Sequence, residues 1–392
     1  MKILFVAHSD VISGGANRAL LHMVSILRRD YGVEPVVLLP EGSGEMQQSC
    51  EKQGIKVYRH KYYRCCTVFR GEGRDLLRLI KLIAAPLLDI WHAICLDKQL
   101  SEDFELVYTN DRLTVIGAYL ARRRKIPHIW HVRCFSRINR NHFPPFWYRI
   151  MERYSKRIVL ISRALYQDFS AHVAEKKLRL VLDGVDISRY SAERQKKNAA
   201  FSMLIAGRLV PAKGQEDAIR ALALLRGVYG ADVELYIAGE TPAYEPKDYE
   251  NWLRLLVQEL HLGEKVHFLG EVQNLPELRS EMDVELMCSW CEAFGLVSVE
   301  AMCVSLPVVG TSSGGTLDIL LDGQTGFLYQ TGNAEELAEK IFWLYEHPEE
   351  AIAFGKNGRN RAKELFSVEK NAAAVHAVIC EALQEEWNGA KD

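Results

Sequence analysis

The sequence predicts an α/β protein made of two successive domains, each with a parallel sheet. Two observations support this prediction. Short apolar runs alternate with helical segments along the whole chain, which is the pattern of strand-helix-strand units. A polar, charge-rich segment at residues 188–199 interrupts this alternation, and a new strand-like run follows it. The chain has 392 residues, which is enough for two domains of ordinary size.

The strand-like runs are short and rich in Val, Ile and Leu, as expected for strands that are buried on both faces. They lie at residues 2–7, 35–39, 56–58, 106–109, 128–132, 157–161 and 178–182 in the first half, and at residues 201–206, 233–238, 265–269, 284–288 and 307–310 in the second. Consecutive helices are predicted at residues 335–345, 349–365 and 368–385. We therefore expect two Rossmann-like domains in tandem, joined by the polar segment as a linker.

Charge is divided unevenly along the chain. Residues 1–190 contain 31 Lys and Arg against 19 Asp and Glu, a net charge of +12, whereas the remaining residues contain 18 against 32, a net charge of −14. The basic excess is densest between Arg112 and Arg163, where 13 basic residues accompany one acid, Glu152. A basic first domain suggests an anionic partner such as a phosphate or a membrane surface. Ordered aromatic modules for base stacking are absent, so no nucleic-acid partner is expected.

The N-terminus and the cysteines indicate a cytoplasmic protein. The first apolar run turns polar at His8, so it is a strand and not a signal peptide. No segment reaches the ~18 uninterrupted apolar residues of a membrane span. Nine cysteines without a secretory signal indicate reduced thiols. Cys288 and Cys291 form a C-x-x-C with no second pair, so core packing is favoured over zinc or redox chemistry.

The least polar stretch of the second half, residues 286–317, contains two charges, Glu292 and Glu300. It predicts a strand, a turn at Glu292, a helix, another strand and a further helix that opens at Gly314-Gly315. A buried, unpaired carboxylate costs several kcal/mol or shifts its pKa. The two glutamates therefore either face solvent or have partners, and spacing alone leaves both possibilities open. The turn itself lies where a parallel strand ends and a helix begins, which is where open α/β sheets bind ligands.

A second ligand-binding turn opens the second domain. Arg208 follows a strand directly, and Lys213 with Gly214 precedes a helix. Side chains placed in this way can reach one anion, and the helix dipole adds to the attraction. The pattern favours a diphosphate, which is the leaving group of a nucleotide-sugar.

The first strand leads into a glycine loop with Gly14 and Gly15, and then into a helix. The loop lacks the G-x-G-x-x-G spacing, so a dinucleotide site is not expected there. Paired glycines at a helix start still let a ligand approach the backbone closely. A simple turn is the alternative interpretation.

Taken together, these motifs resemble glycosyltransferase family 4, the retaining enzymes of the two-domain GT-B type. The resemblance is carried by Gly207-Arg208-Leu209, Lys213-Gly214, the E-x7-E signature from Glu292 to Glu300 with its internal Phe294-Gly295-Leu296, Pro307-Val308-Val309, and Gly314-Gly315. It is strong in the second domain and weaker in the first. It implies domains at residues 1–186 and 187–366 with a cleft between them, and a C-terminal helix, residues 367–392, that returns to the first domain.

The resemblance also implies a role for each motif residue. Arg208 and Lys213 would hold the donor diphosphate, and Glu300 the ribose. Glu292 would hold the transferred sugar, together with the backbone amides of Phe294, Gly295 and Leu296. Gly14 and Gly15 would belong to the nucleotide-sugar site. His131 matches a first-domain histidine that lies near the sugar in such enzymes, although a strand-end histidine with a purely structural role is the alternative.

Three positions depart from the family pattern. The family usually has Gly at the position of Ser305, Asn at that of Asp183 and Glu at that of Asp318. The first two departures concern turn geometry, because Gly and Asn tolerate a positive φ angle better than most residues. None of the three removes a phosphate ligand.

We therefore expect a retaining, hexosyltransferase-type enzyme that takes a UDP- or GDP-linked sugar as its substrate and uses no cofactor and no metal. Arg208, Lys213 and backbone amides can stabilise the charge of the departing diphosphate, and no Asp-x-Asp pair stands at a strand end to bind Mg²⁺. Neither glutamate is a convincing nucleophile, and the resemblance implies a front-face route in which the leaving phosphate takes the acceptor's proton. The alternatives are a nucleotide-sugar 2-epimerase of the same architecture and a non-catalytic anion-binding protein.

The expected acceptor is a glycan or a lipid-linked glycan, as in polysaccharide biosynthesis, and an anionic membrane surface is a further candidate partner. Three features favour the membrane: the basic run 122–125, the aromatic segment 142–148, and an apolar helix at residues 76–83 with basic residues three apart. A core helix beside a solvated charged face is the alternative. The expected location is the cytoplasm, with peripheral binding to the inner face of the membrane.

Overall fold

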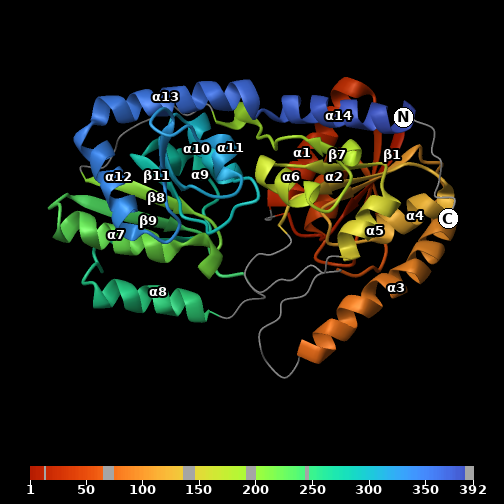
Figure 1. Ribbon diagram of the computed structural model, residues 1–392, viewed down its shortest axis with the longest axis horizontal. Coiled ribbons are helices and arrows are strands. Elements are labelled where there is room, and N and C mark those ends of the chain that lie inside the picture. The colour runs from red at the N-terminus through yellow and green to blue at the C-terminus, as the bar shows by residue number, and fades with distance from the viewer. Residues whose placement is uncertain (13–14, 65–74, 136–145, 191–199, 243–246, 385–392) are drawn as a thin grey trace. The chain divides into compact units, whose positions relative to one another are not determined.

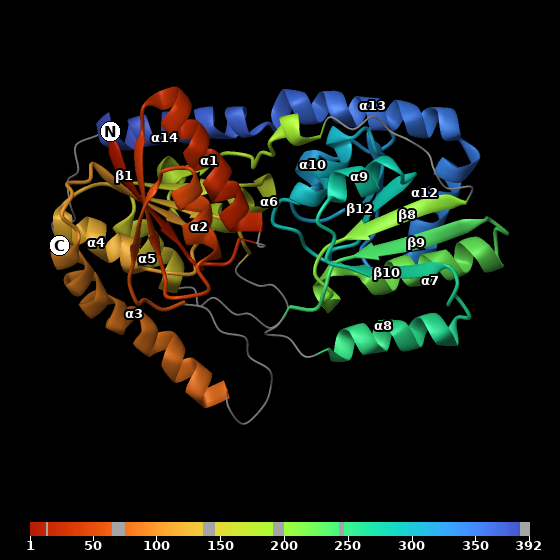
Figure 2. The same cartoon turned by 180° about the vertical axis from the view of Figure 1, so that it is seen from behind.

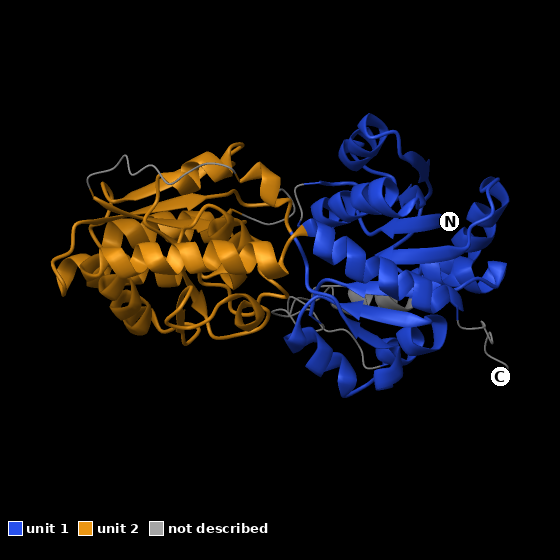
Figure 3. Cartoon of the chain, turned by 90° about the horizontal axis from the view of Figure 1, so that it is seen from above, with its two compact units in different colours: residues 1–184, 368–392 blue, residues 185–367 orange. Residues whose placement is uncertain are grey.

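The computed structural model describes residues 1–12, 15–64, 75–135, 146–190, 200–242 and 247–384. The chain divides into two compact units (Figure 3). Unit 1 contains residues 1–184 and 368–392, and unit 2 contains residues 185–367. Each unit has a central sheet with helices packed on its faces (Figures 1 and 2). The prediction of two parallel α/β domains is confirmed.

Unit 1 has a seven-stranded sheet in the order β3-β2-β1-β4-β5-β6-β7, in which all neighbouring strands run parallel. The strands are β1 Lys2–Ala7, β2 Glu34–Leu39, β3 Lys56–Arg59, β4 Leu106–Asn110, β5 His128–Val132, β6 Arg157–Leu160 and β7 Leu178–Leu180. The helices are α1 Gly15–Tyr31, α2 Glu45–Lys52, α3 Asp75–Gln99, α4 Ile116–Arg124, α5 Phe146–Tyr154, α6 Arg163–Ser170, the short η1 Glu175–Lys177, and α14 Val368–Gln384.

Two apolar clusters form the core of unit 1. Side chains of α1, α2 and α14 pack on one face of the sheet. Side chains of α3 and α4 pack with the opposite face. Because both faces are covered, β4 and β5 are buried along their whole length, as is usual for the central strands of a parallel sheet.

Unit 2 repeats the plan with six parallel strands in the order β10-β9-β8-β11-β12-β13. The strands are β8 Phe201–Ala206, β9 Val233–Ala238, β10 Val266–Gly270, β11 Val284–Met287, β12 Val308–Thr311 and β13 Gly326–Tyr329. The helices are η2 Ile187–Arg189, η3 Pro211–Lys213, α7 Gln215–Gly227, α8 Asp248–Glu259, α9 Leu275–Ser280, α10 Leu296–Cys303, α11 Thr316–Ile319, α12 Ala334–Glu346 and α13 Pro348–Leu365. Helices α7, α8 and α12 share one apolar core with the sheet.

The strand order defines where a ligand can bind in each unit. In both sheets the order reverses after the first strand, between β1 and β4 in unit 1 and between β8 and β11 in unit 2. At such a switch point the two following loops turn to opposite faces and leave a crevice outside the carboxyl ends of the strands. The loops after β8 and β11 contain the two motifs that the sequence singles out in the second domain.

Most strand predictions agree with the structure to within a few residues, but β13 was not predicted. It is a four-residue edge strand, too short to show periodicity. Of the polar segment at residues 188–199, the first residues belong to η2, and residues 191–199 lie outside the described part of the chain.

Candidate active site

Three of the predicted residues meet at the switch point of unit 2. Lys213 ends the short helix η3 after β8, and Glu292 lies in the loop after β11. The Nζ atom of Lys213 lies 2.5 Å from Oε2 of Glu292. Arg208 follows β8 closely, and its charge also acts on Glu292. Two cationic side chains, Arg208 and Lys213, and the carboxylate of Glu292 therefore lie at the carboxyl edge of the sheet.

Two glycines allow the loops to approach this closely. Gly214 has φ 67°, and a Cβ atom there would lie 2.1 Å from the carbonyl oxygen of Cys288. Gly314 has φ 57°, and a Cβ atom there would lie 2.3 Å from the carbonyl oxygen of Glu292. Backbone hydrogen bonds complete the contact, from Trp290 N to Ala212 O at 3.0 Å and from Gly315 N to Glu292 O at 2.8 Å. The site is thus assembled by backbone packing that side chains would prevent.

Glu292 is held as a carboxylate. Burial by itself raises its pKa, but the charge and hydrogen bond of Lys213, the Ser289 hydroxyl at 3.0 Å and the charge of Arg208 together bring the pKa below its ordinary value. Ser289 is fixed in turn because its carbonyl oxygen accepts a hydrogen bond from Thr311 Oγ1 at 2.8 Å. Glu292 is therefore a preformed hydrogen-bond acceptor and not an acid.

Glu300 is buried and has a cationic partner that the sequence did not identify. Nη1 of Arg279 lies 2.9 Å from Oε2 of Glu300, while the same guanidinium group binds both oxygens of Glu285 at 2.6 and 2.9 Å. The side chains of Arg279 and Glu285 are 0% exposed. The interpretation that Glu300 points to solvent is wrong. A lone glutamate in the apolar strand β11 is the signal that a buried cation had to be nearby.

The start of α10 supplies backbone and not side chains to the site. Phe294 is buried, with its ring 5.7 Å from that of Phe366 in an edge contact. Gly295 has φ 107° and precedes the helix, which begins at Leu296. The first amides of a helix have no partner within it, so this turn can donate hydrogen bonds to hydroxyl groups, as the sequence suggests.

His131 lies at the end of β5 in unit 1 and is fully buried. Its Nδ1 atom is 2.7 Å from the Tyr108 hydroxyl and 3.3 Å from Nη2 of Arg133. Burial first, and the charge of Arg133 second, hold the pKa of His131 well below its ordinary value. The ring is therefore neutral at physiological pH.

The glycine loop of unit 1 is partly described. Gly14 lies outside the described residues, and Gly15 is the exposed first residue of α1. Asn17 anchors the loop, because its Nδ2 donates to Ser9 O at 2.9 Å and to Val11 O at 2.8 Å. The buried Asp10 binds Arg59 Nη2 at 2.5 Å, an ion pair that the sequence did not reveal.

Comparison with known proteins fits this geometry. Residues 186–361 match the family described as glycosyl transferases group 1, and residues 14–182 match the glycosyl transferase 4-like domain. The chain belongs to glycosyltransferase family 4. It is 30% identical to the N-acetyl-alpha-D-glucosaminyl L-malate synthase of Bacillus anthracis over 177 residues, 45% of this chain and 44% of that protein.

Two further similarities extend over nearly the whole chain. The trehalose synthase of Thermococcus litoralis is 24% identical over 387 residues, 94% of this chain and 88% of that enzyme. The crystal structure of Anabaena Alr3699/HepE in complex with UDP covers 97% of this chain and 100% of its own with a TM-score of 0.79 and 24% identity. The similarity to the Anabaena structure establishes the GT-B glycosyltransferase fold.

Two of the departures from the family 4 pattern have a structural explanation. Ser305 has φ 61°, which is the left-handed conformation that makes glycine the usual residue there. Asp183 has no positive φ, so the expectation that it affects turn geometry is wrong. It instead forms a buried ion pair with Arg133, whose Nη1 donates to both carboxylate oxygens. Burial raises the pKa of Asp183 and the Arg133 charge opposes that rise. The two-oxygen contact is that of an ionised carboxylate.

Only residues 146–148 of the aromatic segment expected to face a membrane are described, and two of these three belong to the core. Trp147 is 1% exposed and Tyr148 4% exposed, so that expectation was wrong for both, while Phe146 is exposed. His142, Phe143, Arg137 and Arg140 lie outside the described residues. Some of the basic excess is also neutralised internally, since Arg124 pairs with Asp97.

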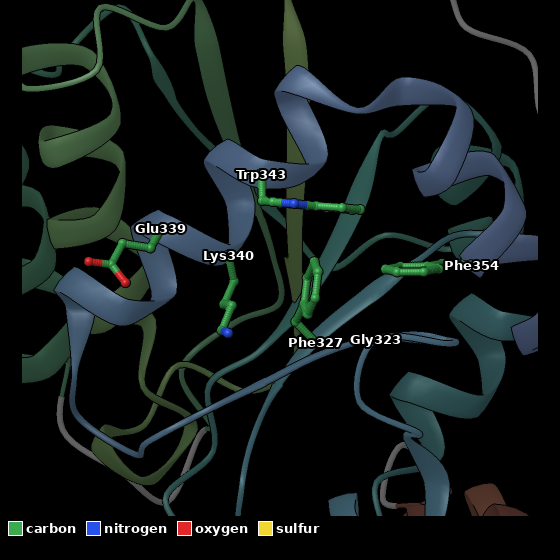
Figure 4. Close-up of a pocket in the computed structure, with 6 residues that line it drawn as sticks. All are labelled: Gly323, Phe327, Glu339, Lys340, Trp343 and Phe354. Carbon is green, nitrogen blue, oxygen red and sulfur yellow. The ribbon is translucent and has the colours of Figure 1, made fainter.

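A hollow of about 570 Å³ lies elsewhere in unit 2, at β13, α12 and α13. Figure 4 shows its aromatic rings turned toward one another. Trp343 lies 5.0 Å from Phe327 in an edge contact and 5.7 Å from Phe354 in a stacked one, while Lys340 lies over the Phe327 ring. These contacts hold the two helices on the edge strand, and the hollow contains none of the motif residues.

Proposed function

We propose that this enzyme transfers a sugar from a nucleoside-diphosphate donor to a glycan or lipid-linked glycan acceptor, with retention of configuration and without a metal ion. The observation that carries the proposal is the meeting of Arg208, Lys213 and Glu292 at the switch point of unit 2. A diphosphate needs cations and a helix N-terminus, whereas a sugar needs a fixed acceptor for its hydroxyl groups. This edge of the sheet offers all three.

The donor diphosphate is assigned to Arg208, Lys213 and the start of α7. That helix begins at Gln215 and has 13 residues, so its dipole favours an anion at its first turn. Two side-chain cations can stabilise the negative charge that develops on the departing diphosphate. This charge compensation is the reason to propose a reaction that does not require Mg²⁺.

The sugar and ribose are assigned to the two glutamates. Glu292 accepts hydrogen bonds as a carboxylate and lies beside the amides that begin α10, which suits a polyol. Glu300 is held by Arg279, so its carboxylate is fixed in orientation before a nucleotide binds, which suits recognition of vicinal ribose hydroxyls. Neither glutamate is assigned a nucleophilic role.

The proposed step breaks the bond between the anomeric carbon and the diphosphate oxygen. The acceptor hydroxyl forms the new glycosidic bond on the same face of the sugar, and a diphosphate oxygen takes the hydroxyl proton. The products are the glycoside and the nucleoside diphosphate. Lys213 and Arg208 stabilise the leaving group, and Glu292 orients the sugar without taking part in bond formation.

Peripheral membrane binding on the cytoplasmic side is part of the proposal, and α3 supports it. Its buried face, with Asp89, His92 and Leu96, packs toward the sheet. Around residues 87–91 its other face is apolar: Leu87 is 62% exposed and Trp91 is 61% exposed, with Leu88 and Ile90 beside them. An apolar outer face on a helix of a basic domain suits insertion into the headgroup region of an anionic membrane. Among the described residues, no helix is long and apolar enough to span a bilayer.

A thermal-shift screen with UDP-, GDP- and other nucleotide-sugars tests the donor assignment. A donor at ~100 times its dissociation constant adds about 2.7 kcal/mol to the free energy of unfolding. The expected result is stabilisation by one nucleoside diphosphate and its sugars. A 2-epimerase would convert the bound nucleotide-sugar into its epimer without releasing diphosphate, and an anion-binding protein would respond equally to inorganic pyrophosphate.

A further inference from the structure

A chain of hydrogen bonds in unit 1 determines which ring nitrogen of His131 carries the proton. Nδ1 is 2.7 Å from Tyr108 Oη and 3.3 Å from Arg133 Nη2. A guanidinium nitrogen can only donate, so Nδ1 accepts and the Tyr108 hydroxyl donates to it. The proton of the neutral ring is then on Nε2. A cation that donates to Nδ1 also opposes a second protonation of the ring.

Arg133 is held from two further sides. Its Nε donates to Asn110 Oδ1 at 2.7 Å, and its Nη1 donates to both carboxylate oxygens of Asp183. The side chains of Arg133 and Asp183 are 2% and 4% exposed. Because the guanidinium group is planar, acceptors on Nε and Nη1 fix the direction of Nη2 toward His131.

The Asp183 loop is tied to the C-terminal helix of the same unit. Asn371 of α14 is buried, and its Nδ2 donates to the carbonyl oxygen of Leu182 at 2.8 Å. The backbone that carries Asp183 is therefore held by a contact that does not involve Arg133. An asparagine at position 183 would keep the shape but would remove the charge, leaving a buried cation without compensation.

Nε2 of His131 is buried and has no hydrogen-bond partner among the described residues. A buried donor without a partner destabilises the folded state, so such an atom in a native structure needs an explanation. It lies at the carboxyl end of β5, and ligands of parallel α/β sheets bind at that edge. A ligand oxygen atom would satisfy it.

We propose that Asp183, Arg133 and Tyr108 are positioning residues that hold His131 as an Nε2–H donor to a hydroxyl oxygen of a carbohydrate bound at the carboxyl edge of the unit 1 sheet. The proposal rests on the proposed function, because it takes the ligand to be a sugar. It assigns His131 the role of a neutral hydrogen-bond donor and not of a general acid. The charge on Asp183 keeps Arg133 in place, and Arg133 and Tyr108 together select the tautomer.

The first test is nitrogen NMR of the full chain labelled with ¹⁵N-histidine, with the His131 signals assigned by their loss in His131→Gln. The expected spectrum between pH 6 and 8 shows Nδ1 as a bare acceptor nitrogen and Nε2 as protonated. In Asp183→Asn and Tyr108→Phe, we expect a mixture of tautomers. A His131 ring protonated on Nδ1, or on both nitrogens, overturns the proposal.

The second test uses the rate of transfer from the donor sugar. Loss of a hydrogen bond to a charged group corresponds to a factor of roughly 10–100, so kcat in Asp183→Asn is expected to fall by about this factor. In a His131→Ala background, the same substitution is expected to change kcat by less than about twofold, because coupled residues are not additive. If Asp183→Asn lowered kcat by the same factor in the unmodified enzyme and in His131→Ala, Asp183 would have a merely structural role. Tyr62→Phe, which removes another buried hydroxyl of unit 1 bound to Ala7 O, is the matched control for Tyr108→Phe.

The two tests separate this proposal from the proposed function. The NMR experiment needs no substrate, so it can overturn the tautomer assignment in an enzyme that transfers sugar normally. Conversely, a chain with the expected tautomer that releases no diphosphate from any nucleotide-sugar would contradict the sugar ligand and the proposed function, but not the hydrogen-bond chain.

Discussion

The ammonium group of Lys213 lies 2.5 Å from a carboxylate oxygen of Glu292. The two residues are 79 positions apart and belong to the loops after β8 and β11, the two strands at which the order of the sheet reverses. The resemblance to glycosyltransferase family 4 assigns them to different parts of the donor, the diphosphate and the sugar. Because Lys213 lowers the pKa of Glu292, substitutions at the two positions have to be interpreted together.

Replacing Lys213 with Ala is expected to lower turnover by roughly 10²–10³, the usual loss for one donor aimed at a developing charge. The substitution also removes the charge that lowers the pKa of Glu292, so the pKa of that carboxyl group should rise. The fold should remain intact because Lys213 is partly exposed. Steady-state kinetics with the true donor and acceptor measures the effect.

Lys265→Ala is the matched control for Lys213→Ala. The Lys265 side chain is 26% exposed against 21% for Lys213, and it pairs with Glu234 at 3.1 Å. Lys265 belongs to the same unit but not to the site, so the turnover of the Lys265→Ala enzyme should stay near that of the unmodified enzyme. Near-normal turnover in Lys213→Ala would remove the diphosphate assignment.

The two glutamates should differ in which ligand they affect. Glu300→Gln is expected to weaken binding of both the free nucleoside diphosphate and the nucleotide-sugar. Glu292→Gln is expected to weaken binding of the nucleotide-sugar alone, and to leave the free diphosphate unchanged or tighter because Lys213 loses its carboxylate partner. Calorimetric titration with both ligands measures this difference. Equal losses for both ligands in Glu292→Gln would show that its assignment to the sugar is wrong.

The sequence predicts the fold well, because the information is local. Apolar runs of four to six residues separated by helical periods specify buried parallel strands, and only β13, four residues at a sheet edge, was missed. Arg208, Lys213 and Glu292 also lie together, since motif residues at strand ends converge wherever the strands are neighbours. The sequence could indicate positions at which glycine is needed, such as Gly214. It could not show which backbone atoms a side chain at these positions would contact.

The partners of the buried charges could not be predicted in the same way. Arg279 binds Glu285 and Glu300 from positions 6 and 21 residues away, and nothing in the pattern of helix α9 distinguishes this arginine from a surface residue. Arg133 was counted among basic residues facing an anion, whereas it is buried against Asp183. Counting charges along a sequence does not show which of them are compensated within the fold.

Buried neutral histidines should make stability depend on pH. Burial lowers the pKa of His128 to about 3, while an unfolded histidine titrates near 6.5. Below pH ~6.5 the unfolded chain therefore binds a proton that the folded chain does not, and the free energy of unfolding falls as the pH falls. Each such histidine contributes up to about 1.4 kcal/mol per pH unit.

His128→Gln isolates this contribution. Urea unfolding between pH 7 and 5 is expected to give a pH slope that is smaller than that of the unmodified chain by up to about 1.4 kcal/mol per pH unit. The absolute stability will also change, because His128 bonds Thr109 Oγ1 at 2.8 Å, but a lost hydrogen bond does not alter the slope. An unchanged slope would mean that His128 protonates in the folded chain.

Membrane binding should depend on the outer face of α3. Leu87→Ser combined with Trp91→Ser is expected to reduce co-sedimentation with vesicles of phosphatidylcholine and phosphatidylglycerol at low salt by roughly tenfold or more, since each side chain buries apolar area worth about 1.5–3 kcal/mol. Leu255→Ser, at a site 55% exposed on α8 of unit 2, is the control. If the unmodified protein stays in the supernatant at low ionic strength, a soluble acceptor replaces the membrane-bound one.

The central claim is that a cationic site without a metal ion splits a nucleotide-sugar with retention at the anomeric carbon. Its most direct test is proton NMR of the enzyme incubated with the stabilising nucleotide-sugar in the presence of EDTA and without acceptor, so that water slowly takes the acceptor's place. The proposed function predicts release of the nucleoside diphosphate together with free sugar that first appears in the anomeric configuration of the donor. Release only after Mg²⁺ is added, or sugar that first appears in the opposite configuration, would contradict it.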